Sequence, residues 1–339
     1  MPGRSRITTL TTLALLPLAV TAACSSAESD TVPARTQAAA PADAEAAGSP
    51  FWVDPRSDAA RQVTAWEAQG RNSDAQALRR ISDQPMALWG PGDDPGPEIR
   101  RAVDGARATK RTVVLTAYNI PYRDCGQHSA GGAPDATAYR GWIGAFADNI
   151  GDARAIVILE PDAVPHIVDG CTQADHHDER YRLLSEAIDR LKRNKNTKVY
   201  LDAGNPAWIP DPMKLVEPLY KAGIDRADGF SLNVSNFQPD AVGRSYGAAL
   251  SKGTRGKHFV YDTSRNGDGP LPGNRPQAWC NPPGRALGAR PTDRTGDPLI
   301  DAYLWIKRPG ESDGPCRGGP EAGRWWPDYA LGLARRAKE

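Results

Sequence analysis

Short apolar runs alternate with amphipathic stretches from about residue 51 onward. The stretches at residues 97–109, 136–150 and 178–194 have the spacing of amphipathic helices. The apolar runs do not alternate with polar residues, which is typical of strands buried on both faces of a parallel sheet. These runs are residues 86–89, 112–118, 155–160, 198–203, 229–234, 257–262 and 302–307. The pattern predicts an α/β fold of right-handed βαβ units, with seven parallel strands where the common barrel has eight.

One long segment, residues 266–301, interrupts this alternation. It is rich in Pro and Gly and has no helical period. Loops of that length are usually functional or disordered. Cys280 lies inside the segment, so we expect an ordered loop held by a bridge.

The first 50 residues have a different pattern. Arg4 and Arg6 precede an uncharged stretch with a short apolar core and then small residues, as in a secretory signal. Thr and Pro interrupt that core, which is shorter than the ~20 residues of a membrane span. We therefore expect a signal peptide over residues 1–24. Residues 25–50 are rich in Ala, Ser, Pro and acid, which predicts a disordered linker before a single domain over residues 51–339.

The chain has five cysteines, and an exported protein should not keep a stray thiol. Cys24 follows VTAA, which resembles a bacterial lipobox, where the Cys becomes lipidated. The alternative is an ordinary signal, with Cys24 removed or left free. The other four form an even set. Pairing in sequence order joins Cys125 to Cys171 and Cys280 to Cys316, one of three connectivities open to four cysteines.

Charge is balanced, with 42 Lys and Arg against 41 Asp and Glu. No net field draws such a protein to nucleic acid or to anionic membranes, and a neutral polymer is a compatible partner. The run Asp175, His176, His177 and Asp178 is the candidate metal site. Adjacent ligands cannot face one ion without a sharp turn. We therefore expect a polar loop there, and neither metal nor cofactor.

Three acidic stretches follow predicted strands, where α/β folds carry their catalytic groups. Asp124 lies in YNIPYRDC, Asp162 in ILEPDAVP and Asp313 in WIKRPGESDG. Carboxyls that converge on one cleft suit glycoside hydrolysis, which needs a protonated acid and help for an attacking water. The sequence therefore indicates a carbohydrate-cleaving enzyme.

These three stretches occur in order with LDAGNPAW, GFSLNVSNF, DTSRNG and WCNPPGRALG. Their order and spacing resemble glycoside hydrolase family 6, the β-1,4-glucan-cleaving cellulases, from about Phe51 to the C-terminus. The resemblance implies a distorted, TIM-like barrel of seven parallel strands, in agreement with the strand count from the pattern. It also implies inversion at the anomeric carbon.

The resemblance implies catalytic roles for four side chains. Asp162 matches the general acid, whose pKa is raised by apolar walls and a nearby anion. Asp124 matches the aspartate that keeps this acid protonated and lies on the proton path of the water. Tyr118 matches the tyrosine that distorts the sugar ring. Asp313 occupies the position proposed for the catalytic base, and the alternative is a water that passes its proton toward Asp124.

Sugar contacts are expected from aromatic faces and a few polar groups. Trp89, Trp208 and Trp279 match family positions that stack on glucose rings. The polar candidates are Ser129, Asp202, Asn233, Asn236, Lys307 and Glu311. Two departures from the family stand out: Asn205 replaces a usual His, and Asp211 replaces a second Trp of the cellobiohydrolases.

The sequence thus predicts a secreted, monomeric and inverting endo-β-1,4-glucanase that acts on cellulose or a related β-glucan. One alternative is a cellobiohydrolase of the same family, which differs by closed tunnel loops. Another is a surface lipoprotein that binds glycan without cutting it. A binder has no need of Asp124, Asp162, Asp313 and Tyr118 together.

Overall fold

The computed structural model describes residues 49–273 and 277–338. The predicted signal peptide over residues 1–24, the lipobox at Cys24 and nearly all of the predicted linker over residues 25–50 lie outside the described residues. Among the residues that the structure describes, no helix has the length and the apolar character needed to cross a membrane.

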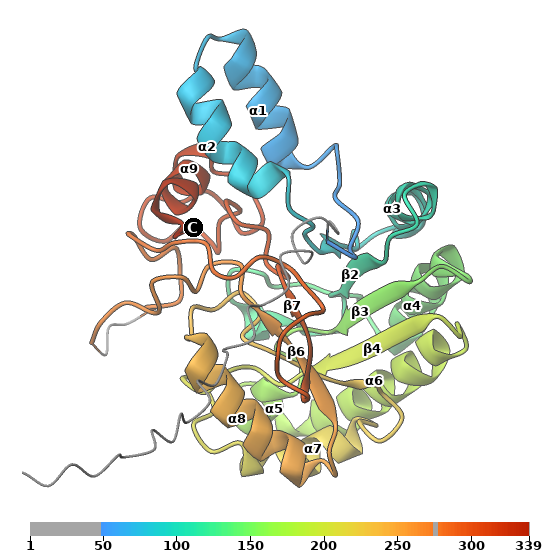
Figure 1. Ribbon diagram of the computed structural model, residues 1–339. Coiled ribbons are helices and arrows are strands. Elements are labelled where there is room, and N and C mark those ends of the chain that lie inside the picture. Colours follow the sequence, from blue (N-terminus) through green and yellow to red (C-terminus); the bar gives the residue numbers. More distant parts are fainter. Residues whose placement is uncertain (1–48, 274–276, 339) are drawn as a thin grey trace, which may run out of the picture. The chain divides into compact units, whose positions relative to one another are not determined.

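Seven strands form one parallel sheet in which every strand pairs with the next along the chain (Figure 1). The strands are β1 (Leu88–Trp89), β2 (Val113–Ala117), β3 (Ala155–Leu159), β4 (Thr197–Asp202), β5 (Gly229–Leu232), β6 (His258–Asp262) and β7 (Ile300–Leu304). The sheet curls into a half-barrel with β1 and β7 as its edges, and the Ala87 amide donates to the Trp305 carbonyl across the seam (2.9 Å). The predicted seven-stranded parallel β/α barrel is confirmed.

Side chains of each strand alternate between two apolar layers, which explains why the runs are apolar throughout. Val113 and Leu115 face the layer shared with the surrounding helices, while Val114 belongs to the layer inside the curl. On β3, Val157 joins the outer layer and Ile158 the inner one. The expectation of a sheet buried on both faces is therefore correct.

Helices connect the strands and cover the outside of the sheet (Figure 1). They are α3 (Gly96–Ala108), α4 (Ala136–Ile150), α5 (Pro165–Val168), α6 (His177–Lys192), α7 (Met213–Lys221) and α8 (Asp240–Gly253). Three further helices were not part of the predicted alternation and form a separate apolar cluster: α1 (Asp58–Ala68), α2 (Asn72–Ser82) and α9 (Pro327–Arg336).

Strand β7 ends earlier than the apolar run predicts. The sequence suggests a strand through Lys307, but the sheet pairing stops at Leu304. Beyond that point the buried Asp262 carboxylate accepts the backbone amides of Ile306 (3.3 Å) and Lys307 (2.9 Å). A side chain at the end of β6 thus takes the place of a strand partner.

The long segment over residues 266–301 contains no helix in its described part, as expected. Cys280 is fully buried and bridged to Cys316. A backbone bond from Gly267 to Ala286 closes the segment on itself, and one from Gly288 to Thr263 holds it against the end of β6. The loop is ordered where it is described.

Candidate active site

The loops after β2 and β3 and the last residue of β4 bring three aspartates to the same end of the sheet. Ligand atoms of Asp124, Asp162 and His166 all lie within 4.8 Å of one another. The Asp162 amide donates to Oδ2 of the fully buried Asp202 (2.9 Å). The structure therefore joins the two predicted carboxyls and adds a histidine that the sequence did not single out.

Two of these loops carry non-glycine residues in the left-handed region of backbone space. After β2, Asp124 has φ 54° and Cys125 has φ 47°. After β3, Glu160 has φ 47° and Asp162 has φ 72°. Such conformations cost free energy and gather at functional sites, where the surrounding structure maintains them.

Burial is the main reason why the pKa of Asp162 is raised to about 7. The negative charge of Asp202 is the next contribution, and Asp124 adds a smaller one. His166 and a hydrogen bond with Tyr118 act in the opposite direction. The sequence assigned the repulsion to Asp124 alone, whereas the structure gives Asp202 the larger share. Near neutral pH a large fraction of Asp162 is protonated, as a general acid requires.

Tyr118 lies between Asp162 and Trp89. Its ring meets that of Trp89 edge-on with 5.3 Å between centroids, and the Arg123 guanidinium stands 4.9 Å above it. Burial, followed by the charges of Asp162 and Asp124, raises the pKa of Tyr118 well above its usual value. The phenol therefore stays neutral and can share a proton with the carboxyl next to it.

The loop that carries Asp124 is tied down on both sides. The Ser129 amide donates to Asp124 Oδ2 (2.6 Å), so Ser129 contacts this carboxyl through its backbone. The buried Arg180 donates to the carbonyls of Pro121 (3.0 Å) and Tyr122 (2.9 Å). The Cys125–Cys171 bridge, paired as predicted, links this loop to the one after β3.

Asp313 is held by cations. Its Oδ2 accepts from Arg265 Nη1 (2.8 Å) and from the Asn281 amide (3.0 Å), and Lys307 Nζ lies 3.5 Å from Oδ1. Burial alone would raise the pKa of Asp313, but Arg265 and Lys307 outweigh it and the pKa is lowered. This carboxylate stays ionised and has little affinity for a proton.

Lys307 and Glu311 are both buried beside Asp313. Burial lowers the pKa of Lys307, although Asp313 opposes this. Burial raises the pKa of Glu311, and Arg308, whose Nε lies 2.7 Å away, opposes that shift. The predicted polar contacts after β7 thus form one charged cluster with Asp313.

Asn233 differs from its predicted role. Its side chain is fully buried; Nδ2 donates to the Asp262 carbonyl (2.8 Å) and Oδ1 accepts the Gln238 amide (3.0 Å). The amide group therefore fixes the chain after β5 and is not available to a sugar. Asn236 is half-buried, and its Oδ1 accepts from Phe237 and Gln238.

The three tryptophans predicted to stack on sugar are partly exposed. Trp208 donates to Asp169 Oδ2 (2.8 Å) and packs edge-on against His166. Asn205 caps the turn that carries it, accepting the Trp208 amide (3.2 Å). Trp89 donates to the Ile306 carbonyl, and Trp279 is 37% exposed. By contrast, the following tryptophans are buried: Trp52, Trp66, Trp142 and Trp305.

Sequence reasoning missed several buried charges around the site. Glu160 accepts the amides of Asn119 and Ile120, and burial raises its pKa to about 7. Arg265 is fully buried and anchors Asp313. Both lie in motifs noted above, LEPD and DTSRNG. A charge directly after an apolar run was the available signal.

The residues of the rejected metal motif point to separate partners. The His176 ring stacks on Tyr122 (4.0 Å between centroids), and His177 Nε2 lies 2.8 Å from the Thr172 carbonyl. Asp124, Asp162 and His166 are close enough to share an ion. The raised pKa of Asp162 suits acid catalysis.

A carboxyl whose pKa is raised to about 7 and a second carboxyl beside it follow two neighbouring parallel strands, and a third carboxyl, held ionised, follows the last strand of the same sheet. This arrangement defines an acid-catalysing hydrolase of the β/α-barrel class. The family model described as glycosyl hydrolases family 6 matches residues 46–337, and the chain belongs to that family.

Known relatives agree with this assignment. Endoglucanase A of Cellulomonas fimi is 40% identical over 294 residues, which cover 86% of this chain and 62% of that protein. Endoglucanase 1 of Streptomyces halstedii is 41% identical, with 83% of this chain and 87% of that protein covered. The endoglucanase Cel6 of Mycobacterium tuberculosis, solved with a methyl-cellobiosyl-4-deoxy-4-thio-β-D-cellobioside, superposes with a TM-score of 0.78 at 45% identity, covering 85% of this chain and 97% of that one.

Proposed function

We propose that this protein is an inverting endo-β-1,4-glucanase. The observation that carries the proposal is the protonated Asp162 beside Asp124, with the pKa of Asp162 raised to about 7. The names of the relatives and the cellobioside ligand of the M. tuberculosis enzyme support a β-1,4-glucan substrate. Partly exposed tryptophans on either side of the carboxyls fit a chain of sugar rings.

In the proposed reaction, Asp162 gives its proton to the bridging oxygen as the bond from that oxygen to the anomeric carbon breaks. A water attacks the opposite face of the sugar and loses a proton. Asp313 remains paired with Arg265 and its pKa is lowered, so we assign it the part of a fixed negative charge that orients the water. The proton then passes toward Asp124.

The function is tested on soluble carboxymethylcellulose. An endo-acting enzyme lowers the viscosity early, before many reducing ends appear, whereas an exo-acting enzyme releases ends with little loss of viscosity. Proton NMR of cello-oligosaccharide hydrolysis should show the α-anomer first, because inversion of a β-linkage gives that anomer. Asp162→Asn serves as the inactive control. Binding without release of sugar by the wild type would favour the glycan-binding alternative.

We further propose that the protein is exported as a monomer, with an N-terminal signal and Cys24 as a lipidation site. Cell fractionation tests this. Lipidated protein should sediment with membranes, and Cys24→Ser should move it to the medium. Light scattering of the released protein should give the mass of one chain.

A further inference from the structure

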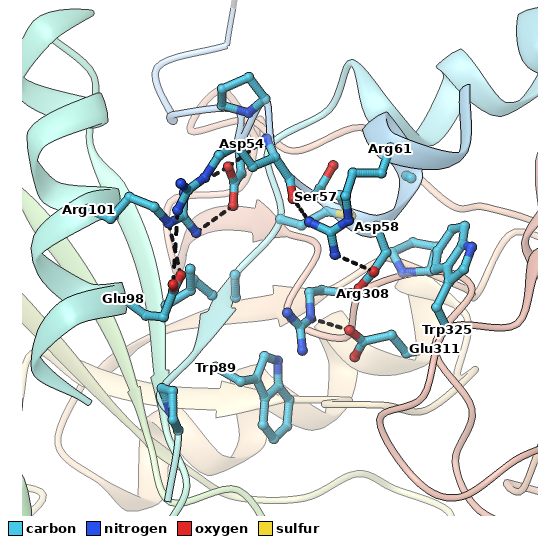
Figure 2. A pocket seen from close by; sticks show the side chains of 18 residues that line it. Asp54, Ser57, Asp58, Arg61, Trp89, Glu98, Arg101, Arg308, Glu311 and Trp325 are labelled. Atoms are coloured by element: carbon cyan, nitrogen blue, oxygen red, sulfur yellow. Dashed lines mark hydrogen bonds and ion pairs between the residues drawn. The ribbon is translucent and has the colours of Figure 1, made fainter. Parts of the chain in front are cut away.

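A cavity of about 710 Å³ opens beside Trp89 (Figure 2). Its walls come from the start of α1, from β1, from the first turns of α3 and from the chain after β7. Sites that hold small molecules typically enclose ~300–1,000 Å³. The volume is therefore sufficient for a ligand and not only for a few waters.

The cavity follows from the seam of the half-barrel. β1 and β7 are the edges of the sheet, and the backbone bond from Ala87, which lines the cavity, to Trp305 joins the chain across the seam. Arg308 and Glu311 come from the segment after β7, while Leu88 and Trp89 form β1 itself. Ser57, Asp58 and Arg61, at the start of α1, contribute another wall of the cavity (Figure 2).

The lining is charged but balanced. Four carboxylates and four arginines contribute to it, giving a formal net charge of zero. Most are already paired: Arg101 with Asp54 (2.8 Å) and Arg308 with Glu311 (2.7 Å). A charged ligand would have to break such pairs. A neutral ligand rich in hydroxyl groups can use their remaining donors and acceptors.

Two carboxylates on opposite walls have capacity left for such a ligand (Figure 2). Asp58, at the start of α1, is paired with Arg61, and its charge contributes to the raised pKa of Glu311. Glu98, on α3, binds Arg101 but lies 3.9 Å from Arg56 Nη2, beyond hydrogen-bonding distance. The Trp89 and Trp325 side chains add apolar surface between these walls.

The cavity shares the side chain of Trp89 with the surroundings of the candidate active site. Trp89 lines it and also contacts Tyr118, whose pKa is raised by burial and by the neighbouring charge of Asp162. Glu311 lines it too, two residues before Asp313. A sugar chain that passes Asp162 and stacks on Trp89 would therefore reach this cavity with its next unit.

We propose that the cavity is an additional sugar subsite, which binds a glucosyl unit of the substrate beyond the one held at Trp89. The assignment rests on the proposed glucanase function and adds that the rate of cleavage depends on the length of the sugar chain. Asp58 and Glu98 are the residues that recognise the hydroxyl groups of this unit.

The test is a series of soluble cello-oligosaccharides, from cellotriose to celloheptaose, with kcat/KM measured for each. For the wild type, kcat/KM should rise at the chain length that first fills the cavity. Asp58→Ala and Glu98→Ala should each lower kcat/KM on substrates of that length or longer by about tenfold, as expected for loss of a hydrogen bond to a charged group. Shorter substrates should be cleaved at rates within about twofold of the wild type, because these bonds are not made.

Asp189→Ala is the matched control, since Asp189 is also an exposed helix residue paired with an arginine, Arg226, but lies on α6 outside the cavity. Variants that follow the wild type at every chain length would overturn the subsite. The subsite would also be overturned if the wild type cleaved glucan but its kcat/KM did not rise with chain length. A wild type that cleaves no glucan would overturn the proposed function, and this inference with it.

Discussion

The proton on Asp162 depends on the side chains that surround it. If Asp162 is the acid, Asp162→Asn should reduce kcat/KM on unactivated glucan by about 10²–10⁴-fold, the usual contribution of general acid catalysis. A substrate with a good leaving group needs less help from a proton, so its hydrolysis should be spared in part. Near wild-type cleavage of unactivated glucan by this variant would contradict the assignment.

The pH profile should show which neighbour matters most. With the pKa of Asp162 raised to about 7, kcat/KM should fall as the pH rises through that value, because the acid loses its proton. Asp202→Asn removes the larger of the two repelling charges. It should therefore move this basic limb to lower pH.

The matched control for that shift is Asp301→Asn. Asp301 pairs with His258 near the start of β6, at the opposite end of the same sheet. Loss of this carboxylate should leave the basic limb in place. An unchanged limb in Asp202→Asn would show that the charge of Asp202 does not raise the pKa of Asp162.

At the scale of elements, the contact between α8 and β6 leaves no room for side chains at two glycines. A Cβ at Gly247 would come within 2.3 Å of the Phe259 ring. Gly247→Ala should therefore lower the free energy of unfolding by about 1–3 kcal/mol, the usual cost of overpacking. Gly141→Ala in α4 meets nothing within 4 Å. It should be neutral or stabilise by up to about 1 kcal/mol through helix propensity. Equal effects in thermal or urea unfolding would contradict this account.

The strands could be predicted because both faces of the sheet are buried, so each strand is a continuous apolar run. Asp124 and Asp162 could be placed because they follow two neighbouring strands. The structural role of Asn233 could not be predicted, because the Asp262 carbonyl that accepts its hydrogen bond lies at the end of the next strand. Likewise, nothing local shows that Arg265 neutralises Asp313, 48 residues further on. Contacts between distant segments decide these roles.

At the scale of the whole molecule, buried carboxyls make stability depend on pH. Burial raises the pKa of Glu160 and Asp162 to about 7 and that of Asp202 to about 6. Their contribution to the free energy of unfolding is complete below ~4, the pKa of these groups in the unfolded chain, and is lost as the pH rises to about 7. The lowered pKa of Asp313 acts oppositely, adding stability above ~4. The thermal midpoint should therefore be highest between about pH 4 and 6. A midpoint that climbs steadily to pH 8 would contradict these shifts.

The Cys280–Cys316 bridge should matter for the site before it matters for the fold. It lies beside Asn281, which exchanges hydrogen bonds with Asp313, whereas the sheet supplies the core. Cys280→Ser with Cys316→Ser should raise KM and cost about 2–5 kcal/mol of stability. With increasing reductant, activity should fall before the far-UV circular dichroism changes. Simultaneous loss of both would contradict a local role.

Because each strand pairs with the one made just before it, the sheet can be assembled in the order in which a ribosome releases the chain. The loop that carries Asp313 is synthesised 48 residues after Arg265. Until that loop arrives, the Arg265 guanidinium, which is fully buried in the folded protein, lacks the carboxylate with which it forms an ion pair. Closure of the cleft around Arg265 is therefore expected to follow the synthesis of the loop that carries Asp313.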